Sequence, residues 1–369
     1  MHHTGDAVKP TAELSSFGNS YMSPNTPGSG LSCVWGDHNQ RLREILEDNR
    51  LPQIVKICEE DVVQSNGEGS EGFNFQQPLL LYKEVKLTRV FSRNVRRDPG
   101  PRGREREVGP YVVIPEHYPG FFKVLNTEGS DDMALTSLST VARIMPASFL
   151  CLVKLKGFVA HHQRKDTLVY EKKEIPPGLL YVMNIHEDQV TYINSRKSEK
   201  RKLILSLRCT NRDRNVEILL PYDSTGQFYI VDLKKSSSRS CVNAGAFAHT
   251  ISSIMQTFDK DSVTKVQLIY GDPPSQECQF TGVLRISHVT KEHTVIACTL
   301  NSVEPKILEL SITPHPKFKL ALQTADQHSD VVKRKCLAFM KTAYEKFRRD
   351  LKVRRDYEIE KRDLREDYD

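Results

Sequence analysis

The sequence lacks the features of a membrane protein, of a disulfide-rich secreted protein and of a zinc domain. It has no uninterrupted apolar run of about 20 residues, the length that a helix needs to cross a bilayer, and residues 1–10 lack the apolar segment of a secretory signal. Its eight cysteines form no CxxC pairs, which is typical of reduced thiols. We therefore expect a protein without a membrane span, located in the cytoplasm and also in the nucleus.

Motifs for catalysis, metal binding and nucleotide binding are missing too. No glycine-rich loop enters a helix, and no GxSxG sequence marks a nucleophile. His117 and the pair His161-His162 have no Cys/His spacing around them that would supply several metal ligands. We expect no cofactor, no metal and no enzymatic activity.

The charge is balanced enough that any attraction to acidic partners must come from local clusters. The net charge is +6 over 369 residues, which is modest for this length. With 38% hydrophobic and 27% charged residues, the composition is that of a globular protein. We predict a disordered tail over residues 1–36, one domain over residues 37–322 and a charged helix over residues 323–369. A short helix is expected from an N-cap at Asp37 to about Arg50.

The domain is organised around residues 203–228, which predict a β-hairpin followed by a bend. Apolar residues alternate along both strands, so that Leu203, Leu205, Leu207 and Cys209 should point inward, with Ser206 and Arg208 between them, and Val216, Ile218 and Leu220 should do the same. Pro221 cannot donate a ladder hydrogen bond, and the residues after it favour turns. The strand should bend there, before Phe228 returns to the core.

The same pattern occurs earlier in the chain. Ile114-Pro115, Gly120 and Phe122 repeat Leu220-Pro221, Gly226 and Phe228 at the same spacing, and residues 138–145 align with residues 248–255 as short helices that precede strands at 149–155 and 263–270. We infer an internal duplication with halves at about 51–160 and 161–275 and closing strands over 276–322. The fold class is therefore mainly β (α+β), built from two related β units with short helices. The first copy has no cysteine that matches Cys209.

These residues resemble the CABIT family of the Themis and GAREM signalling proteins. The family motif is a cysteine, a spacer, apolar-x-Leu-Pro-apolar, three residues and Gly-x-Phe, and the matching residues are Cys209, Ile218, Leu220, Pro221, Tyr222, Gly226 and Phe228. The resemblance covers residues 50–322 as a single CABIT module. It implies a non-catalytic signalling scaffold near tyrosine kinases or phosphatases, whose protein partner is an SH2-containing adaptor or a tyrosine phosphatase.

A basic segment and three tyrosines are candidate contact sites. The segment over residues 93–109 contains Arg93, Arg96, Arg97, Arg102, Arg104 and Arg106, which predicts a hairpin loop that contacts phosphate or an acidic partner. A second basic loop lies at Lys197–Lys202. Tyr192 begins a YxN sequence of the kind that SH2 domains read after phosphorylation, and Tyr357 and Tyr368 lie in an acidic context that tyrosine kinases accept.

The last segment has apolar residues at helical spacing, at Val332, Cys336, Phe339 and Met340. Coiled-coil pairing of this helix, and with it the oligomeric state, stays open. Two other functions also stay open. The basic loops and this helix could contact nucleic acid, although aromatic residues are not interleaved with them as stacking modules require. Cys209 could be a reactive thiol, but its position among leucines is typical of a structural cysteine.

Overall fold

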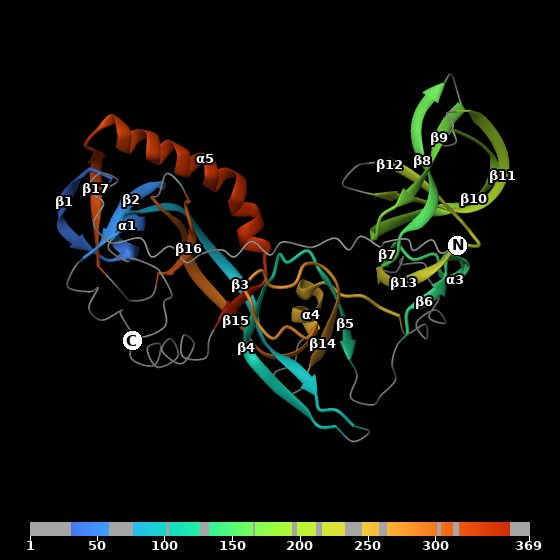
Figure 1. Ribbon diagram of the computed structural model, residues 1–369, viewed down its shortest axis with the longest axis horizontal. Coiled ribbons are helices and arrows are strands. Elements are labelled where there is room, and N and C mark those ends of the chain that lie inside the picture. The colour runs from blue at the N-terminus through green and yellow to red at the C-terminus, as the bar shows by residue number, and fades with distance from the viewer. Residues whose placement is uncertain are drawn as a thin grey trace, which may run out of the picture.

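The computed structural model of the chain is mainly β, which confirms the predicted fold class (Figure 1). The structure describes residues 31–58, 77–100, 103–125, 133–164, 167–193, 198–211, 216–232, 246–257, 264–300, 304–312 and 317–354. No described helix is both long enough and apolar enough to cross a bilayer.

The strands form two sheets. The first contains β1 (Cys33–Gln40), β2 (Gln53–Ile57), β3 (Leu79–Arg97), β4 (Glu105–Pro115), β5 (Phe121–Leu125), β14 (Lys265–Tyr270), β15 (Val283–Thr299), β16 (Ile307–Ser311), β17 (Phe318–Thr324) and β18 (Lys352–Arg354). The second contains β6 (Leu135–Ser137), β7 (Ser148–Cys151), β8 (Leu155–Arg164), β9 (Thr167–Ile175), β10 (Gly178–Ile193), β11 (Glu199–Asn211), β12 (Val216–Pro221) and β13 (Thr225–Asp232). The described part of the chain contains the helices α1 (Leu42–Asp48), α3 (Leu138–Ile144), α4 (Ile251–Thr257) and α5 (Gln327–Arg349).

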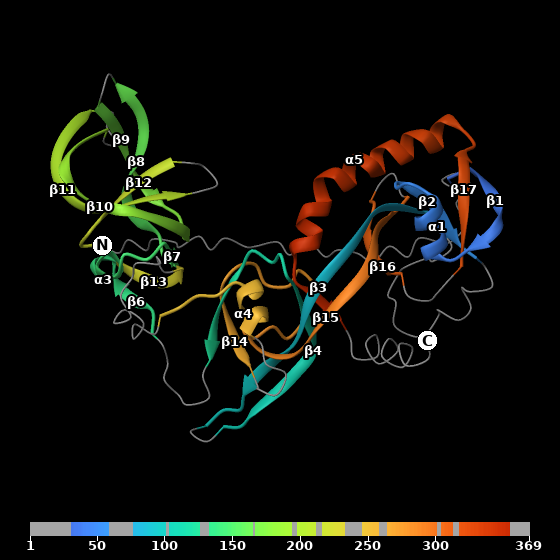
Figure 2. The ribbon, with the colours of Figure 1, turned by 180° about the vertical axis from the view of Figure 1, so that it is seen from behind.

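Part of the second sheet closes into a ring. β11 pairs with β12 along one edge and with β10 along the other, and β8 and β9 complete the circle between them. Phe158, Tyr170, Val190, Ile204 and Leu219, one from each strand, pack together as a buried cluster. This ring lies at one end of the molecule, and α5 lies at the other end beside β2, β16 and β17 (Figures 1 and 2).

Two parts of the fold share one pattern of strand pairing, and we call them the first and second bend units. The first contains β3, β4, β5, α4, β14 and β15, and the second contains β11, β12, β13, α3, β7 and β10. In each, a hairpin ends at a proline, and the next strand pairs with the strand after a short helix. The strand after the helix, β14 or β7, pairs with a long strand, β15 or β10. This long strand also pairs with the first strand of the hairpin, β3 or β11.

The register supports this correspondence. Pro115 lies opposite Arg89 and Pro221 lies opposite Ser206. The long strand of each unit also has a register shift at the corresponding place, after Ile286 in β15 and after Val182 in β10. A β-bulge increases the local twist of a sheet and is a specific feature of a fold rather than a defect. Its presence at the corresponding place in both bend units indicates that one architecture occurs twice.

Each bend unit takes segments from both halves of the sequence. β5 is followed in the chain by α3 and β7, yet it pairs with β14, and Phe122 on β5 packs with Ile251 and Ile254 of α4. Reciprocally, β13 precedes α4 and β14 but pairs with β7, and Phe228 packs with Leu138 and Val141 of α3. Neither bend unit is made from residues 51–160 or 161–275 alone. The division of the domain into these two halves therefore stays a prediction about the sequence.

Two element predictions near the amino terminus are wrong. Residues 33–36, assigned to the disordered tail, begin β1, which pairs with β17 over Cys33–Gln40. Asp37 therefore lies in a strand, and the helix begins at Leu42, where the Arg41 backbone N–H donates to Glu44 Oε2 at 2.8 Å. The pairing partner of β1 is nearly 300 residues away in the sequence, so no local signal indicates it.

The inward face of β11 also differs from the prediction. Leu207 and Cys209 are fully buried as expected, but Leu203 and Leu205 are 67% and 41% exposed, whereas Ile204 and Ser206 are buried. The reason is that different neighbours cover the two faces. α3 and β13 cover the face of Leu207 and Cys209, and β8 and β9 cover the face of Ile204.

The charged carboxy-terminal helix is present, but it does not extend over residues 323–369. β17 runs to Thr324, and α5 begins after an N-cap at Asp326, whose Oδ1 accepts from the Ser329 N–H at 2.7 Å. Its buried residues include Val332, Cys336 and Met340. α5 ends at Arg349, and β18 then pairs with β4 at Val112 and Val113. β18 thus occupies, in the first bend unit, the place that β8 takes beside β12 in the second.

Candidate functional site

The motif residues of the second bend unit form a buried corner. Cys209, Ile218, Leu220 and Phe228 belong to one apolar cluster, with Tyr222 packed against it. Pro221 O accepts from the Ser224 N–H at 3.0 Å, which closes the bend. A Cβ on Gly226 would lie 2.9 Å from both Phe228 Cζ and Val153 Cγ2. The glycine is needed because the aromatic ring packs directly on the backbone.

The first bend unit is built alike around Ile114, Pro115, Gly120 and Phe122. Ile114 and Phe122 are fully buried, and Pro115 O accepts from the Tyr118 N–H at 2.9 Å. A Cβ on Gly120 would lie 2.1 Å from Tyr118 Cε1. The sequence spacing predicted that these residues correspond to those of the second bend unit. Their contacts are side-chain packing and a backbone hydrogen bond that closes the bend.

Cys209 has the environment of a structural thiol. It is fully buried, and burial raises the pKa of its thiol, so that the reactive thiolate is not available at neutral pH. The corresponding residue of the first bend unit is Ser92, which is also fully buried and donates its hydroxyl to Val112 O at 2.8 Å. Burial alone accounts for the raised pKa of Cys209, and no charged group of the described residues offsets it. Among the residues that the structure describes, no cluster of three or more His, Cys, Asp or Glu could hold a metal ion.

The predicted basic loop is mostly a paired hairpin of β3 and β4, and its arginines are divided between different environments. Arg97 lies opposite Glu105, whose Oε2 accepts from Lys265 Nζ at 2.8 Å. This hydrogen bond lowers the pKa of the Glu105 carboxyl, with further help from nearby cations that include Arg97. Glu107 pairs with Arg285 Nη1 at 3.0 Å. On this side of the hairpin both carboxylates are therefore held in ion pairs, among the cations Arg97, Lys265 and Arg285.

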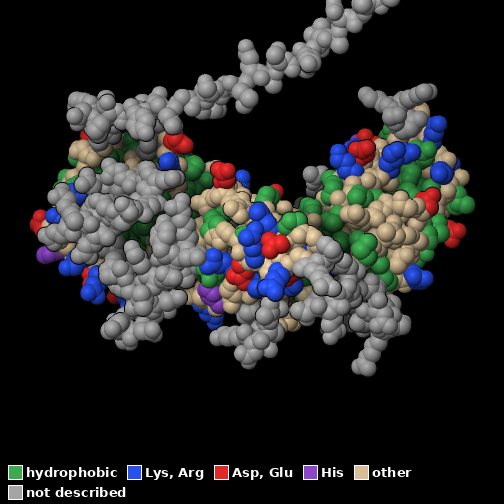
Figure 3. Space-filling model, turned by 60° about the horizontal axis from the view of Figure 1, so that its bottom comes forward, with side chains coloured by type: hydrophobic (Ala, Val, Ile, Leu, Met, Phe, Trp, Pro, Cys, Tyr) green, Lys and Arg blue, Asp and Glu red, His purple; other side chains and the backbone are tan. Residues whose placement is uncertain are grey.

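The other side of the hairpin keeps its positive charge. Arg96 and Arg106 lie directly opposite each other across the two strands, and both are exposed. Arg106 Nε contacts Asp98 Oδ1 at 3.1 Å. We call Arg96 and Arg106 the arginine pair. The hairpin projects from the body of the molecule (Figure 1), and Lys and Arg side chains gather in the middle of the face in Figure 3.

The remaining arginines of the predicted loop play other roles. Arg93 is half-buried, donates to Gly109 O at 3.0 Å and lies with its guanidinium 3.8 Å from the centroid of Tyr111. Arg104 is exposed beside the turn, where its carbonyl accepts from the Asp98 N–H. Arg102 lies outside the described residues.

Tyr192 is half-buried in the ring. It lies in β10, opposite Lys200 and Tyr170, and its ring packs edge-on against Phe158 with centroids 5.1 Å apart. Its phosphorylation stays a prediction. Tyr357 and Tyr368 lie outside the described residues, so they stay predictions.

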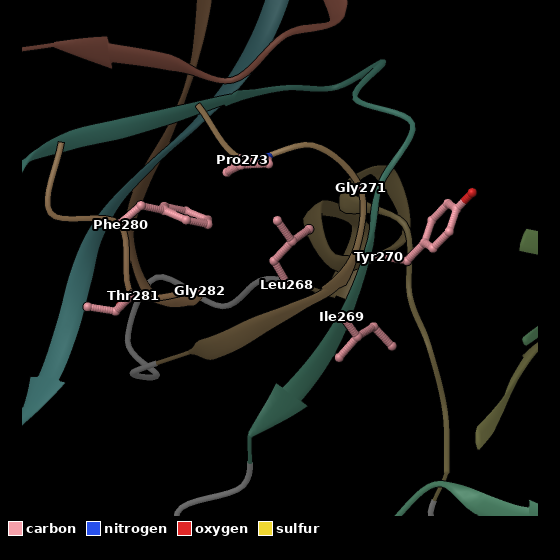
Figure 4. A pocket seen from close by; sticks show the side chains of 8 residues that line it. All are labelled: Leu268, Ile269, Tyr270, Gly271, Pro273, Phe280, Thr281 and Gly282. Atoms are coloured by element: carbon pink, nitrogen blue, oxygen red, sulfur yellow. The ribbon is translucent and has the colours of Figure 1, made fainter. Parts of the chain in front are cut away.

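The structure has an open pocket of about 380 Å³ where β14 ends. Leu268, Phe280 and Pro273 face it, whereas the side chains of Ile269 and Tyr270 point away (Figure 4). Its lining combines these apolar side chains with Thr281 and backbone, and none of the lining residues that the structure describes is charged, so nothing there would orient a charged ligand.

Sequence reasoning missed a buried ion network that ties β18 to the first bend unit. Arg89 is 2% exposed and pairs with Glu309 and, at 2.9 Å, with Glu292. Arg354 of β18 makes two hydrogen bonds to the same Glu292, at 2.6 and 3.0 Å. Next to them, burial lowers the pKa of Lys352 to about 8. No clear signal in the sequence indicated this network, because Arg89 is one of several charged residues in β3, with Lys83, Glu84 and Lys86.

Comparison with known proteins agrees with the motif. The CABIT family model, described as "cell-cycle sustaining, positive selection", matches residues 51–335. The match includes both bend units and the first part of α5. No solved structure matches the chain.

Proposed function

The chain belongs to the CABIT family, and from this premise we propose that it is a non-catalytic signalling scaffold that captures an acidic protein segment on the arginine pair. The partner would be a protein of tyrosine kinase or phosphatase signalling, such as an SH2-containing adaptor or a tyrosine phosphatase. A cytoplasmic location, with access to the nucleus, fits such a role.

The observation that carries the proposal is the placement of Arg96 opposite Arg106. Like charges directly opposite each other in a hairpin destabilise it, and a single carboxylate, Asp98, contacts Arg106. On the other side of the same hairpin, Glu105 and Glu107 are paired with cations. Two exposed guanidinium groups that lie opposite each other, with a carboxylate in contact with only one of them, form a surface suited to an external anion.

The bend units support a scaffold rather than an enzyme. Their motif residues are buried in apolar clusters, and the thiol of Cys209 is kept protonated. They anchor the base of the hairpin, because β3 pairs with β15 from Leu79 to Asn94, and the arginine pair lies just beyond this pairing. A charged projection accelerates the encounter with an oppositely charged partner.

The test is stopped-flow binding of two labelled glutamate-rich peptides, one with and one without a phosphotyrosine, at two salt concentrations. The double variant Arg96→Gln/Arg106→Gln should lower the association rate about threefold to tenfold at low salt, and less at high salt. The single variants Arg96→Gln and Arg97→Gln are the matched comparison, because each removes one positive charge; Arg96→Gln should lower the rate, whereas Arg97→Gln, on the side with the ion pairs, should change it little.

Labelled RNA and DNA, titrated at the same two salt concentrations, test the alternative of a nucleic-acid-binding protein. Tighter binding of RNA or DNA than of either peptide would favour that alternative and refute the scaffold proposal. An association rate that is the same at both salt concentrations, and the same for the wild type and the double variant, would show that the arginine pair does not capture the partner.

A further inference from the structure

A group of apolar side chains is exposed on the outer face of β10 and β11. Leu203 and Leu205 are 67% and 41% exposed, and Ile185 and Met183 on β10 are 44% and 46% exposed. Ile185 lies opposite Leu207, two residues along the same face from Leu205, so Ile185, Leu203 and Leu205 point to one side of the strand pair. Met183 is the extra residue of the bulge beside them. We call these four residues the apolar patch.

The first bend unit shows that the fold does not require this patch. Ser206 and Arg89 correspond to each other, because each is the strand partner of the proline at the bend. Counting back from them, Leu203 corresponds to Lys86 and Leu205 corresponds to Thr88. Counted from the bulges, Met183 corresponds to Ser287. The same strand pair is therefore built with polar side chains at three of these positions elsewhere in the chain. Contiguous exposed apolar residues that the fold does not need mark an interaction surface.

The charges on this face narrow the choice of partner. Glu187 lies opposite Leu205, and Arg201 lies two residues before Leu203 on the same face. Both are exposed. A membrane surface would favour cations alone around the leucines, whereas an apolar centre with a rim of both signs is the anatomy of a protein interface.

The arrangement is also complementary to itself. A two-fold axis through the apolar patch would place the leucines of two copies together and would bring Arg201 near Glu187 of the partner subunit. Isologous interfaces are reciprocal in this way: if a residue of one copy contacts a second residue of the other copy, the same contact occurs with the two copies exchanged. We propose that the apolar patch is the interface of a homodimer in which two β10–β11 faces pack against each other.

The dimer should be weak. Four partly exposed side chains are fewer than the 20 to 30 residues per partner of a standard interface, so we expect a dissociation constant on the order of 10 μM. The ring of β8–β12 lies at one end of the molecule (Figure 1), which leaves this face accessible to a second copy without involving the β3–β4 hairpin.

Sedimentation velocity over a concentration series around that value is the test. The variant Leu203→Lys/Leu205→Thr inserts the residues that the first bend unit has at these positions, and it should weaken dimerisation at least tenfold. Leu322→Lys is the control, because Leu322 is 68% exposed on β17 and its replacement should leave the dimer intact. Far-ultraviolet circular dichroism checks that the variants fold.

Charge exchange tests the two-fold arrangement itself. Arg201→Glu and Glu187→Arg should each weaken the dimer, and the two together should restore it. A chain that is monomeric at all concentrations, a dimer that is insensitive to Leu203→Lys/Leu205→Thr, or a double charge variant that fails to recover would each overturn the proposal. Binding of the monomer to anionic vesicles, lost in the same leucine variant, would assign the patch to a membrane instead.

Discussion

Removing the Phe228 side chain should loosen α3, which lies far before it in the sequence, and should spare α4, which follows it. Phe228 is fully buried and packs edge-on against Phe149, with ring centroids 5.9 Å apart, in the cluster that contains Leu138 and Val141 of α3. Phe→Ala at such a site costs about 3–5 kcal/mol. The reciprocal variant, Phe122→Ala, should loosen α4 and β14, because Phe122 packs with Ile251.

Hydrogen–deuterium exchange read by mass spectrometry distinguishes the two helices. If opening is local, a loss of about 3 kcal/mol raises exchange by about two orders of magnitude in peptides over α3 for Phe228→Ala, and over α4 for Phe122→Ala. The milder Phe228→Leu, which costs about 1 kcal/mol, keeps the test usable if the alanine variant unfolds. Faster exchange in α4 but not in α3 after either change at Phe228 would refute the exchange of segments between the halves.

Three further outcomes follow from the contacts. Gly120→Ala should lower the free energy of unfolding in urea by about 1–3 kcal/mol, because the new Cβ meets the Tyr118 ring, whereas Gly36→Ala, whose Cβ has 3.4 Å of space, should change it little. Cys209 should react with iodoacetamide in the native protein more slowly than free cysteine does and should react fully in urea; rapid native labelling would contradict the buried thiol. Because the pKa of Lys352 falls from 10.5 to about 8 on folding, the unfolded state binds more protons between these values. The free energy of unfolding of the wild type should therefore rise with pH there relative to Lys352→Met, and parallel curves would contradict it.

Local pattern was sufficient for the elements whose partners are close in the sequence. The β11–β12 hairpin, the bends at Pro115 and Pro221, and the apolar face of α5 all follow from periodicity and turn chemistry, and the CABIT resemblance is confirmed by the family model. Periodicity was insufficient along β11, because different neighbours bury its two faces at different points. An alternating strand indicates that one face is covered, but not where the cover ends.

Exchange of segments has no signature in a single sequence. α3 and α4 have similar helical spacing and both precede short strands, so the sequence is compatible with each helix packing on either bend. The choice is made by tertiary contacts such as the pairing of Phe122 with Leu268. The basic segment shows the same limit. Its arginines are equivalent in the sequence, and only the strand register and the contacts of Lys265 and Arg285 separate the side with the ion pairs from the side of the arginine pair.

The exchange of segments also bears on how a scaffold of this design works. A fragment that ends at residue 160 contains β5 but neither α4 nor β14, so its bend would leave Phe122 without the residues that bury it. Each bend unit is completed only by the other half of the chain, which makes the two units one cooperative body rather than two modules on a tether. The first unit carries the arginine pair and the second carries the apolar patch. A partner held on one and a second copy held on the other would then keep a fixed relation, because Phe121 of the first unit packs with Leu150 and Tyr229 of the second in one buried cluster.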